Sequence, residues 1–364
     1  MKTNNGTNKT VYVGLSGGVD SSLSAALLKN EGYNVVGVYM KNWSGDNYGI
    51  QTDCPWEDDV EDVKAVCKQL NIPFKSYNFE REYRQDVVDY FFREYEAGRT
   101  PNPDVLCNKE IKFKRFLDRA LADGADMIAT GHYAQVRKIS DKYELLRGVD
   151  PNKDQTYFLH TFTQAQLSRV LFPVGEMMKP EVRKLAEKFS LPTAQKKDSQ
   201  GICFIGNIDV QDFLRQKIDT KPGNIVDVDT NEVVGKHDGV MFYTIGQRKG
   251  IGIGGAGAPY FVIGKNKEKN ELLVGKGANH PMLYYTKVKL ENIHWISGET
   301  PKLPLDCEVS IRYRQKAQKA TLVILNENQS IQIEFENPVR AVSPGQSAVI
   351  YQGDICLGGG IIKQ

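Results

Sequence analysis

The stretch GLSGGVDSS, residues 14–22, constrains the fold of this chain more than any other. It lies directly between TVYVGL, an apolar segment typical of a strand, and SLSAALLKNEG, a segment with helical spacing. In a parallel α/β sheet this junction binds phosphate, because backbone N–H groups and a helix N-terminus point out of it. The glycines permit close approach, and Ser16, Ser21 and Ser22 add hydroxyl donors. We therefore predict a phosphate-binding loop in which Asp20 is a candidate ligand for magnesium.

This loop is not of the Walker type, because no Gly-Lys-Ser or Gly-Lys-Thr follows it. An ordinary strand–helix turn with a serine cap is the alternative interpretation. The pattern Ser-Gly-Gly-x-Asp-Ser after a strand resembles the pyrophosphate loop of the PP-loop ATPases, which cleave ATP to AMP and pyrophosphate and activate a substrate oxygen as an adenylate.

A second glycine pattern, GIGGAG at 252–257, fits Gly-x-Gly-x-x-Gly. The strand-like segment APYFVIG, which contains proline, follows it where a dinucleotide-binding loop needs a helix. We therefore reject dinucleotide binding here and interpret residues 243–255 as a flexible basic loop.

The first half of the chain alternates strand and helix patterns, which predicts a parallel sheet covered by helices. The strand patterns occupy residues 10–15, 33–40 and 125–130. The helix patterns occupy residues 22–32, 56–71, 81–98, 113–124, 179–190 and 210–218.

After about residue 210 the pattern changes to short strands separated by Gly and Asn turns. We predict an α/β fold with an N-terminal PP-loop parallel-sheet domain (adenine nucleotide alpha hydrolase-like), then a small central β domain and a C-terminal β-barrel. The expected boundaries are 1–209 for the ATP-binding and catalytic domain, 210–280 for the central domain and 281–364 for the barrel.

Composition limits the possible partners. The chain has 364 residues, 40% hydrophobic and 25% charged, which is typical of a soluble protein with more than one domain. We expect a cytoplasmic protein without a membrane partner, because the N-terminus is polar and no apolar run reaches membrane-spanning length. The net charge of +2 means that a polyanion would have to meet a local basic patch. The six cysteines include no Cys-x-x-Cys, which argues against a zinc ribbon.

The segment PNPDVLC, residues 101–107, places a carboxylate and a thiol on a proline-stiffened loop. Cys107 is expected near the N-terminus of a basic helix, and both the helix end and nearby cations lower the pKa of a thiol. Asp104 is a candidate proton donor or acceptor. A buried structural cysteine is the alternative interpretation. The cations are Lys109, Lys112, Lys114 and Arg115.

Cys203, in KKDSQGICFIG, is flanked by Gly201 and Gly206. It is either a core cysteine among apolar neighbours or a thiol on a loop that can swing. Two separate thiols in an ATP-using enzyme suggest sulfur transfer or thiol–disulfide exchange.

Seven motifs in order resemble the tRNA-specific 2-thiouridylase family, often called MnmA, from about residue 10 to the C-terminus. They are GLSGGVDSS, TPNPDVLCNKEIKF, ATGHYA, LLRGVDPNKDQTYFL, KKDSQGICFIG, YTIGQRKGIGIGG and RYR. The resemblance implies an enzyme that uses ATP and Mg²⁺ to replace the C2 oxygen of the wobble uridine of tRNA with sulfur. It implies Cys107 as nucleophile, Cys203 as persulfide carrier and Asp104 as general acid or base.

The resemblance also implies binding residues. The target base would meet Asn102, Pro103 and Asp104. ATP would meet Gly14, Leu15, Ser16, Gly17, Gly18, Val19, Asp20, Ser21, Met40 and Gly131. The tRNA would meet His132, Lys153, Asp154, Gln155, Arg312, Tyr313 and Gln346.

Several of these residues have ordinary structural interpretations. Met40 suits a strand end in the core, His132 a hydrogen-bonded structural histidine and residues 153–155 a solvated turn. Arg312, Arg314, Lys316 and Lys319 alternate as on the exposed face of a strand, although with Tyr313 they also suit RNA phosphates and a stacked base.

The expected partners are tRNA and a sulfur-donor protein, either a cysteine desulfurase or a relay carrier, and we expect a monomer. Two other functions stay open. Another PP-loop ligase or amidotransferase would not need both cysteines, and a non-catalytic tRNA-binding or sulfur-carrier protein would not turn over ATP. The missing Cys-x-x-Cys disfavours an iron–sulfur enzyme.

Overall fold

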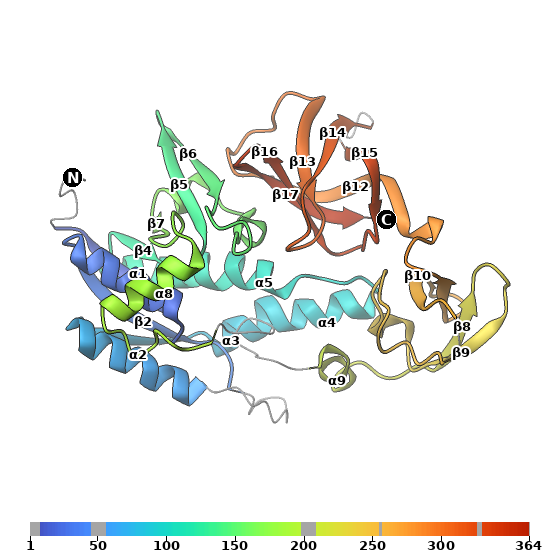
Figure 1. Ribbon diagram of the computed structural model, residues 1–364, viewed down its shortest axis with the longest axis horizontal. Coiled ribbons are helices and arrows are strands. Elements are labelled where there is room, and N and C mark those ends of the chain that lie inside the picture. The colour runs from blue at the N-terminus through green and yellow to red at the C-terminus, as the bar shows by residue number, and fades with distance from the viewer. Residues whose placement is uncertain (1–7, 45–55, 198–208, 255–256, 326–329, 364) are drawn as a thin grey trace.

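A computed structural model describes residues 8–44, 56–197, 209–254, 257–325 and 330–363. Within these ranges the strands form a five-stranded, a four-stranded and an eight-stranded sheet. Figure 1 shows the α/β domain at one end of the molecule, the β-barrel beside it and the small central domain at the other end. No helix in the described part of the chain combines the length and the apolar character that crossing a membrane requires.

The five-stranded sheet is parallel and has the order β3-β2-β1-β4-β7. Its strands are β1 (Thr10–Leu15), β2 (Asn34–Lys41), β3 (Phe74–Asn78), β4 (Met127–Ala129) and β7 (Val170–Leu171). The predicted parallel sheet is therefore confirmed, although β3 and β7 were not predicted from the sequence pattern.

The two faces of this sheet follow from the alternation of side chains along β1. Val11, Val13 and Leu15 pack with the helices on one face, whereas Tyr12 belongs to the core on the other. Helices α1 (Val19–Asn30) and α2 (Trp56–Leu70) contribute to the first core, and α8 (Lys179–Lys188) packs against α1. All three lie where helical spacing predicted them.

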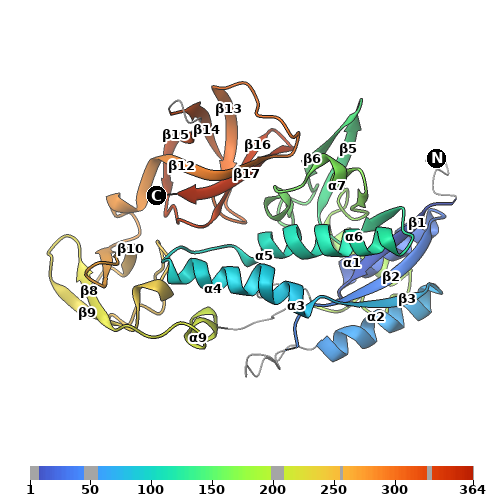
Figure 2. The same ribbon diagram turned by 180° about the vertical axis from the view of Figure 1, so that it is seen from behind.

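Two long helical runs contribute to the core on the other face (Figure 2). The first comprises α3 (Glu80–Tyr83), a π-helical turn (Arg84–Val88) and α4 (Asp89–Glu96). The second comprises α5 (Pro103–Leu106), a π-helical segment (Cys107–Arg115) and α6 (Phe116–Ala122). Asn102 caps the second run, because its side chain accepts hydrogen bonds from the N–H groups of Asp104 and Val105 and Pro103 occupies the first position.

The central domain has the strand order β10-β11-β8-β9. Its strands are β8 (Gly223–Asp227), β9 (Val233–His237), β10 (Tyr260–Asn266) and β11 (Glu271–Lys276). Helix α9 (Val210–Arg215) precedes it and stacks Phe213 on Phe92 of α4, with ring centroids 5.2 Å apart. Strand β10 follows the 252–257 glycine pattern, as predicted, at the place where a dinucleotide-binding loop would need a helix.

The C-terminal domain is a closed six-stranded barrel of order β12-β15-β14-β13-β16-β17, completed by pairing of β12 with β17. Its strands are β12 (Tyr284–Trp295), β13 (Leu305–Ser310), β14 (Gln318–Ile324), β15 (Ile331–Arg340), β16 (Ser347–Gln352) and β17 (Ile355–Lys363). The predicted barrel is confirmed.

A hairpin of the first half of the chain extends the barrel sheet. Strands β5 (Ala134–Ile139) and β6 (Lys142–Arg147) pair with each other, and Leu145 and Leu146 of β6 face Cys356 and Ile355 of β17. The hairpin was not predicted. Further short elements are α7 (Gln164–Leu167) and the 3-10 helices Thr156–Leu159, Val240–Phe242 and Pro281–Leu283.

The expectation of a strand from Arg312 to Lys319 is wrong for most of its length. β13 ends at Ser310 and β14 begins at Gln318, so residues 311–317 form the connecting turn. Arg314 has a left-handed φ of 62°, a conformation that interrupts a strand. The alternating charges therefore mark a turn, and only Lys319 lies on a strand.

Leu145→Ala should destabilise the protein by about 2–5 kcal/mol, because the side chain is fully buried where the hairpin joins the barrel. The midpoint of urea unfolding measures the effect. Ile139→Ala is the control, because Ile139 is 48% exposed on the same hairpin and its loss should change stability by about 0.5 kcal/mol or less. Equal shifts for both variants would contradict a packed junction.

Candidate functional site

The phosphate loop lies where the strand order of the parallel sheet reverses. Strand β1 pairs with β2 on one side and with β4 on the other. The chain therefore passes from β1 into α1 at the point where the sheet is extended first to one side and later to the other. Open α/β sheets bind ligands in the crevice at such a switch point. The segment from Ser16 to Gly18 connects β1 to α1 here.

Three glycines around this loop lie close to neighbouring groups, and the space is tightest at Gly131. Gly17 has φ 74°, and a Cβ there would lie 3.1 Å from the carbonyl oxygen of Asp59. A Cβ on Gly14 would lie 3.1 Å from Cε of Met40. A Cβ on Gly131, directly after β4, would lie 2.5 Å from the backbone nitrogen of Ser21. The loops after β1 and β4 therefore pack backbone against backbone.

Hydroxyl groups fix the loop from inside. The Ser21 hydroxyl accepts from the Ser16 N–H at 3.2 Å and donates to the Gly18 carbonyl at 3.2 Å. Leu15 and Val19, at 2% and 3% exposed, anchor the loop in the core on either side. Gly18 caps α1 without a side chain, so it supplies no acceptor for the first N–H groups of the helix.

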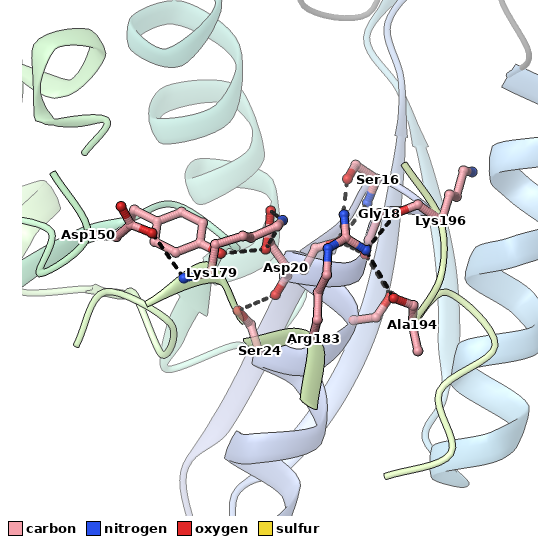
Figure 3. A network of polar contacts seen from close by, with 12 residues as sticks. Ser16, Gly18, Asp20, Ser24, Asp150, Lys179, Arg183, Ala194 and Lys196 are labelled. Atoms are coloured by element: carbon pink, nitrogen blue, oxygen red, sulfur yellow. Dashed lines mark hydrogen bonds and ion pairs between the residues drawn. The ribbon is translucent and has the colours of Figure 1, made fainter. Parts of the chain in front are cut away.

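The Asp20 carboxylate has two partners that the sequence analysis did not identify. Nζ of Lys179, on α8, lies 2.7 Å from Oδ1 and 2.8 Å from Oδ2 of Asp20. The Tyr133 hydroxyl donates to Oδ1 at 2.8 Å. Figure 3 shows Lys179 reaching Asp20 beside the phosphate loop. Both Asp20 oxygens are thus engaged by protein donors.

A second lysine, Lys196, forms ion pairs with two carboxylates of helix α2 on the other side of the loop. Nζ of Lys196 lies 2.7 Å from Asp59 Oδ1 and 2.5 Å from Asp62 Oδ2. Burial alone lowers the pKa of Lys196, but these two bonds raise it overall. Arg183 of α8 donates to the carbonyl oxygens of Ala194 and Lys196 at 3.1 Å each. No local motif marks Lys179, Arg183 or Lys196, because their partners are distant in sequence.

Cys107 is completely buried in the core between the parallel sheet and the barrel. It lies in the second turn of the run that starts at Pro103, so it is near the helix N-terminus as predicted, but its thiol is covered. A Cβ placed on Gly14 would lie 3.3 Å from the ring of Phe116, which belongs to the same helical run as Cys107. One helical run therefore connects the thiol segment to the phosphate loop, over roughly 13 Å at the usual rise per residue of an α-helix.

Neighbouring cations of Cys107 are partly neutralised. Lys109 and Lys114 pair with Glu110 at 3.3 and 2.6 Å, and Arg115 pairs with Asp86 at 3.3 Å. Cys203 lies outside the described residues, so its position relative to Cys107 stays a prediction. No group of three or more His, Cys, Asp or Glu side chains in the described ranges is arranged to hold a metal ion.

The barrel holds the loop that precedes Cys107. Nε2 of Gln346 donates to the carbonyl oxygens of Thr100 and Pro101, at 2.9 and 3.2 Å. The Thr100 N–H donates to the carbonyl of Pro344 at 2.8 Å. A residue predicted to contact tRNA therefore positions the loop predicted to contact the target base.

The predicted RNA residues 153–155 precede the 3-10 helix Thr156–Leu159, which packs against α5 and the Cys107 segment. Asp154 pairs with Arg147 at 3.1 Å. The Tyr313 ring packs against Phe158 at a tilt of 46°, with ring centroids 4.3 Å apart. The fold thus gathers residues 102–104, 153–155, Tyr313 and Gln346 around one junction of sheet and barrel.

Two further predicted RNA residues are held inside the protein. His132 is 7% exposed, its Nδ1 lies 2.8 Å from the Thr130 hydroxyl, and burial followed by the nearby charge of Lys112 lowers its pKa well below the usual value. Arg312 donates through one nitrogen to the carbonyls of Ile245 and Ala341, at 2.9 and 2.8 Å, and so ties the barrel to the central domain.

Three family descriptions match consecutive parts of this chain. They are the tRNA methyl transferase HUP domain over residues 9–207, the tRNA methyl transferase PRC-barrel domain over 211–276 and the aminomethyltransferase beta-barrel domain over 285–362. The fold and the phosphate loop thus define an α/β protein of the HUP class that carries two further β domains.

Curated relatives match almost the whole chain. The tRNA-specific 2-thiouridylase MnmA of Halalkalibacterium halodurans is 53% identical over 97% of this chain and 94% of its own length. The enzyme of the same name from Shouchella clausii is 51% identical over 97% of this chain and 96% of its own length. The chain belongs to the tRNA-specific 2-thiouridylase (MnmA) family.

Solved structures give weaker likenesses. NMN synthetase from Francisella tularensis matches with a TM-score of 0.33 and 15% identity, over 54% of this chain and 69% of that one. A 4-thiouridine synthetase in a complex with RNA and bound ATP matches with a TM-score of 0.34 and 15% identity, over 54% and 45%.

Arg312→Met should lower stability by about 1–3 kcal/mol, because the carbonyls of Ile245 and Ala341 lose a charged donor and keep, among the described residues, only the Ser343 hydroxyl, at 3.4 Å from each. Urea unfolding measures this change. Lys316→Met is the control, because Lys316 is exposed on the same turn. A stable Arg312→Met protein would show that the guanidinium does not hold the two domains together.

Proposed function

We propose that this protein replaces the C2 oxygen of the wobble uridine in tRNA with sulfur, using ATP. Family membership supports the proposal, since relatives named tRNA-specific 2-thiouridylase are about half identical to it over nearly the full length. The observation that carries it is the helical run from Pro103 to Ala122, which joins the buried thiol of Cys107 to the phosphate loop. The same helical run would then position the residues that handle sulfur and the residues that bind the nucleotide.

ATP fits the loop between β1 and α1. The left-handed Gly17 and the N-terminus of α1 provide backbone N–H groups for phosphates. Met40 and Gly131 lie at the ends of the flanking strands, where the adenosine would lie. Both oxygens of Asp20 already accept from Lys179, and Oδ1 also accepts from Tyr133, so a magnesium ion would bind this carboxylate only after the Lys179 ammonium moved off it. Bound there with phosphate oxygens, magnesium would supply positive charge next to the pyrophosphate that leaves.

The chemistry has two stages. The uridine leaves its stack, because C2 cannot otherwise be reached. Its O2 attacks the α-phosphorus of ATP, and pyrophosphate departs. Sulfur then adds to C2, and the bond between C2 and the adenylated oxygen breaks with release of AMP.

Two cysteines supply the sulfur in this scheme. The terminal sulfur of a Cys203 persulfide is the source, and Cys107 attacks the inner sulfur, so that the persulfide bond breaks and a Cys107–Cys203 disulfide forms. An external thiol reductant restores both thiols. The sulfur on Cys203 comes from a donor protein, either a cysteine desulfurase or a relay carrier. Asn102 to Asp104 receive the base, and Asp104 transfers protons.

Burial of Cys107 has a consequence for this scheme. A thiol with no exposed surface cannot be reached from solvent, by a reductant or by a sulfur-donor protein, until the surrounding segment opens. Gln346 and the carbonyls of Thr100 and Pro101 connect that segment to the barrel. We propose that RNA bound between barrel and sheet opens it, so that Cys107 acts only on a docked substrate.

Cys107→Ser should abolish 2-thiouridine formation. The experiment incubates unmodified tRNA with ATP, a persulfide source and the protein, and then measures nucleosides by mass spectrometry. Cys67→Ser is the matched control, because burial raises the pKa of the Cys67 thiol to about 11 and leaves little thiolate at neutral pH. Absence of 2-thiouridine with the wild-type protein, or full activity of Cys107→Ser, would refute the proposal.

Gly131→Ala should weaken ATP binding at least tenfold, because the new Cβ meets the backbone of Asp20 and Ser21 at 2.7 and 2.5 Å. Titration with a fluorescent ATP analogue measures the affinity. Gly254→Ala is the control, because nothing lies within 4 Å of a Cβ there. Wild-type affinity in Gly131→Ala would place ATP elsewhere.

A further inference from the structure

Two chains of contacts lead from residues 150–155 to the phosphate loop, and both end on the Asp20 carboxylate. They connect a segment predicted to bind RNA to a segment predicted to bind ATP. A functional link between the two segments, in addition to a structural role, is therefore worth considering. We define the Asp20 network as Asp20, Tyr133, Asp150, Gln155 and Lys179. The first arm runs through α8 and the second through Tyr133.

In the first arm, Asp150 caps α8 from outside the helix. Met178, at the cap position, provides no side-chain hydrogen bond, and Oδ2 of Asp150 accepts from the Lys179 N–H at 3.0 Å instead. Oδ1 and the carbonyl of Asp150 also accept from the N–H groups of Asn152 and Lys153, at 2.9 and 3.0 Å. One buried carboxylate thus fixes both the 150–155 turn and the residue whose ammonium binds Asp20.

In the second arm, Gln155 binds both backbone groups of Tyr133. Oε1 of Gln155 accepts from the Tyr133 N–H, and the Gln155 N–H donates to the Tyr133 carbonyl, each at 3.0 Å. The Tyr133 hydroxyl then donates to Asp20. Figure 3 shows the first arm from Asp150 through Lys179 to Asp20.

Burial makes the network stiff. Tyr133, Asp150 and Lys179 are 1%, 3% and 8% exposed, and packed interiors do not deform gradually. Lys153 and Gln155 are partly exposed, so an RNA phosphate can reach the turn from solvent. A contact that shifts the turn therefore also shifts the N-terminus of α8 and the Tyr133 ring.

We propose that the Asp20 network couples RNA binding at residues 150–155 to ATP binding at the phosphate loop; this coupling rests on the function proposed above. ATP requires one particular arrangement of Asp20 and Lys179 at the loop. RNA on the turn favours that arrangement in advance through the network, so ATP binds more tightly to the RNA complex. Linkage requires ATP to tighten RNA binding by the same factor, for which about tenfold is typical. Lys179 and Tyr133 act here as positioning residues.

The test is calorimetric titration with the ATP analogue that has a methylene group between the α- and β-phosphates, with and without an anticodon stem–loop RNA. The wild-type protein should bind the analogue about tenfold more tightly with RNA. In Lys179→Met and in Tyr133→Phe the ratio of the two affinities should fall to within twofold of one. Lys188→Met, an exposed lysine of the same helix, should keep the wild-type ratio.

Each result decides something different. A purely structural role for Lys179 would change both affinities together and leave their ratio unchanged, which would overturn the coupling. Should Lys179→Met not fold, Tyr133→Phe, which loses only a hydroxyl, decides alone. A wild-type ratio of one also overturns the coupling. A wild-type protein that binds neither analogue nor RNA would instead refute the proposed function.

Discussion

The placement of β4 beside β1 is the constraint on which the rest of the site depends. Parallel pairing brings the chain after β4 against the first turn of α1, so closely that only glycine fits at residue 131. The phosphate loop is therefore held by backbone packing from the adjacent strand as well as by its own hydroxyl bonds. Tyr133, two residues further on, reaches Asp20 because of the same pairing.

The second organising element is the helical run from Pro103 to Ala122. Its Asn102 cap and proline start set where it begins. Phe116 places its far part beneath the phosphate loop, and Gln346 of the barrel fixes the chain just before it. The segment around Cys107 is thus supported at both ends by different domains, and its geometry depends on the position of the barrel.

Local patterns predicted much of this structure. The phosphate loop, its strand and its helix follow from adjacent residues, as do most helices of the α/β domain. The partnership of Lys179 with Asp20 spans 159 positions and leaves no periodic signal, so sequence analysis missed it. The charges at Arg312, Arg314 and Lys316 alternate as in a strand, but the left-handed Arg314 makes a turn there. Alternation does not distinguish a strand from a charged turn.

The β5–β6 hairpin has a consequence for the order in which the chain acquires its structure. Its partner strand β17 follows about 200 residues later, at the very end of the chain. At typical rates of synthesis a ribosome needs roughly 10–40 s to make that stretch. Throughout this interval the edge of β6 that will pair with β17 has no strand beside it. The nascent chain therefore exposes unpaired backbone groups that can pair with another chain. Chaperone protection during translation would matter most in this interval.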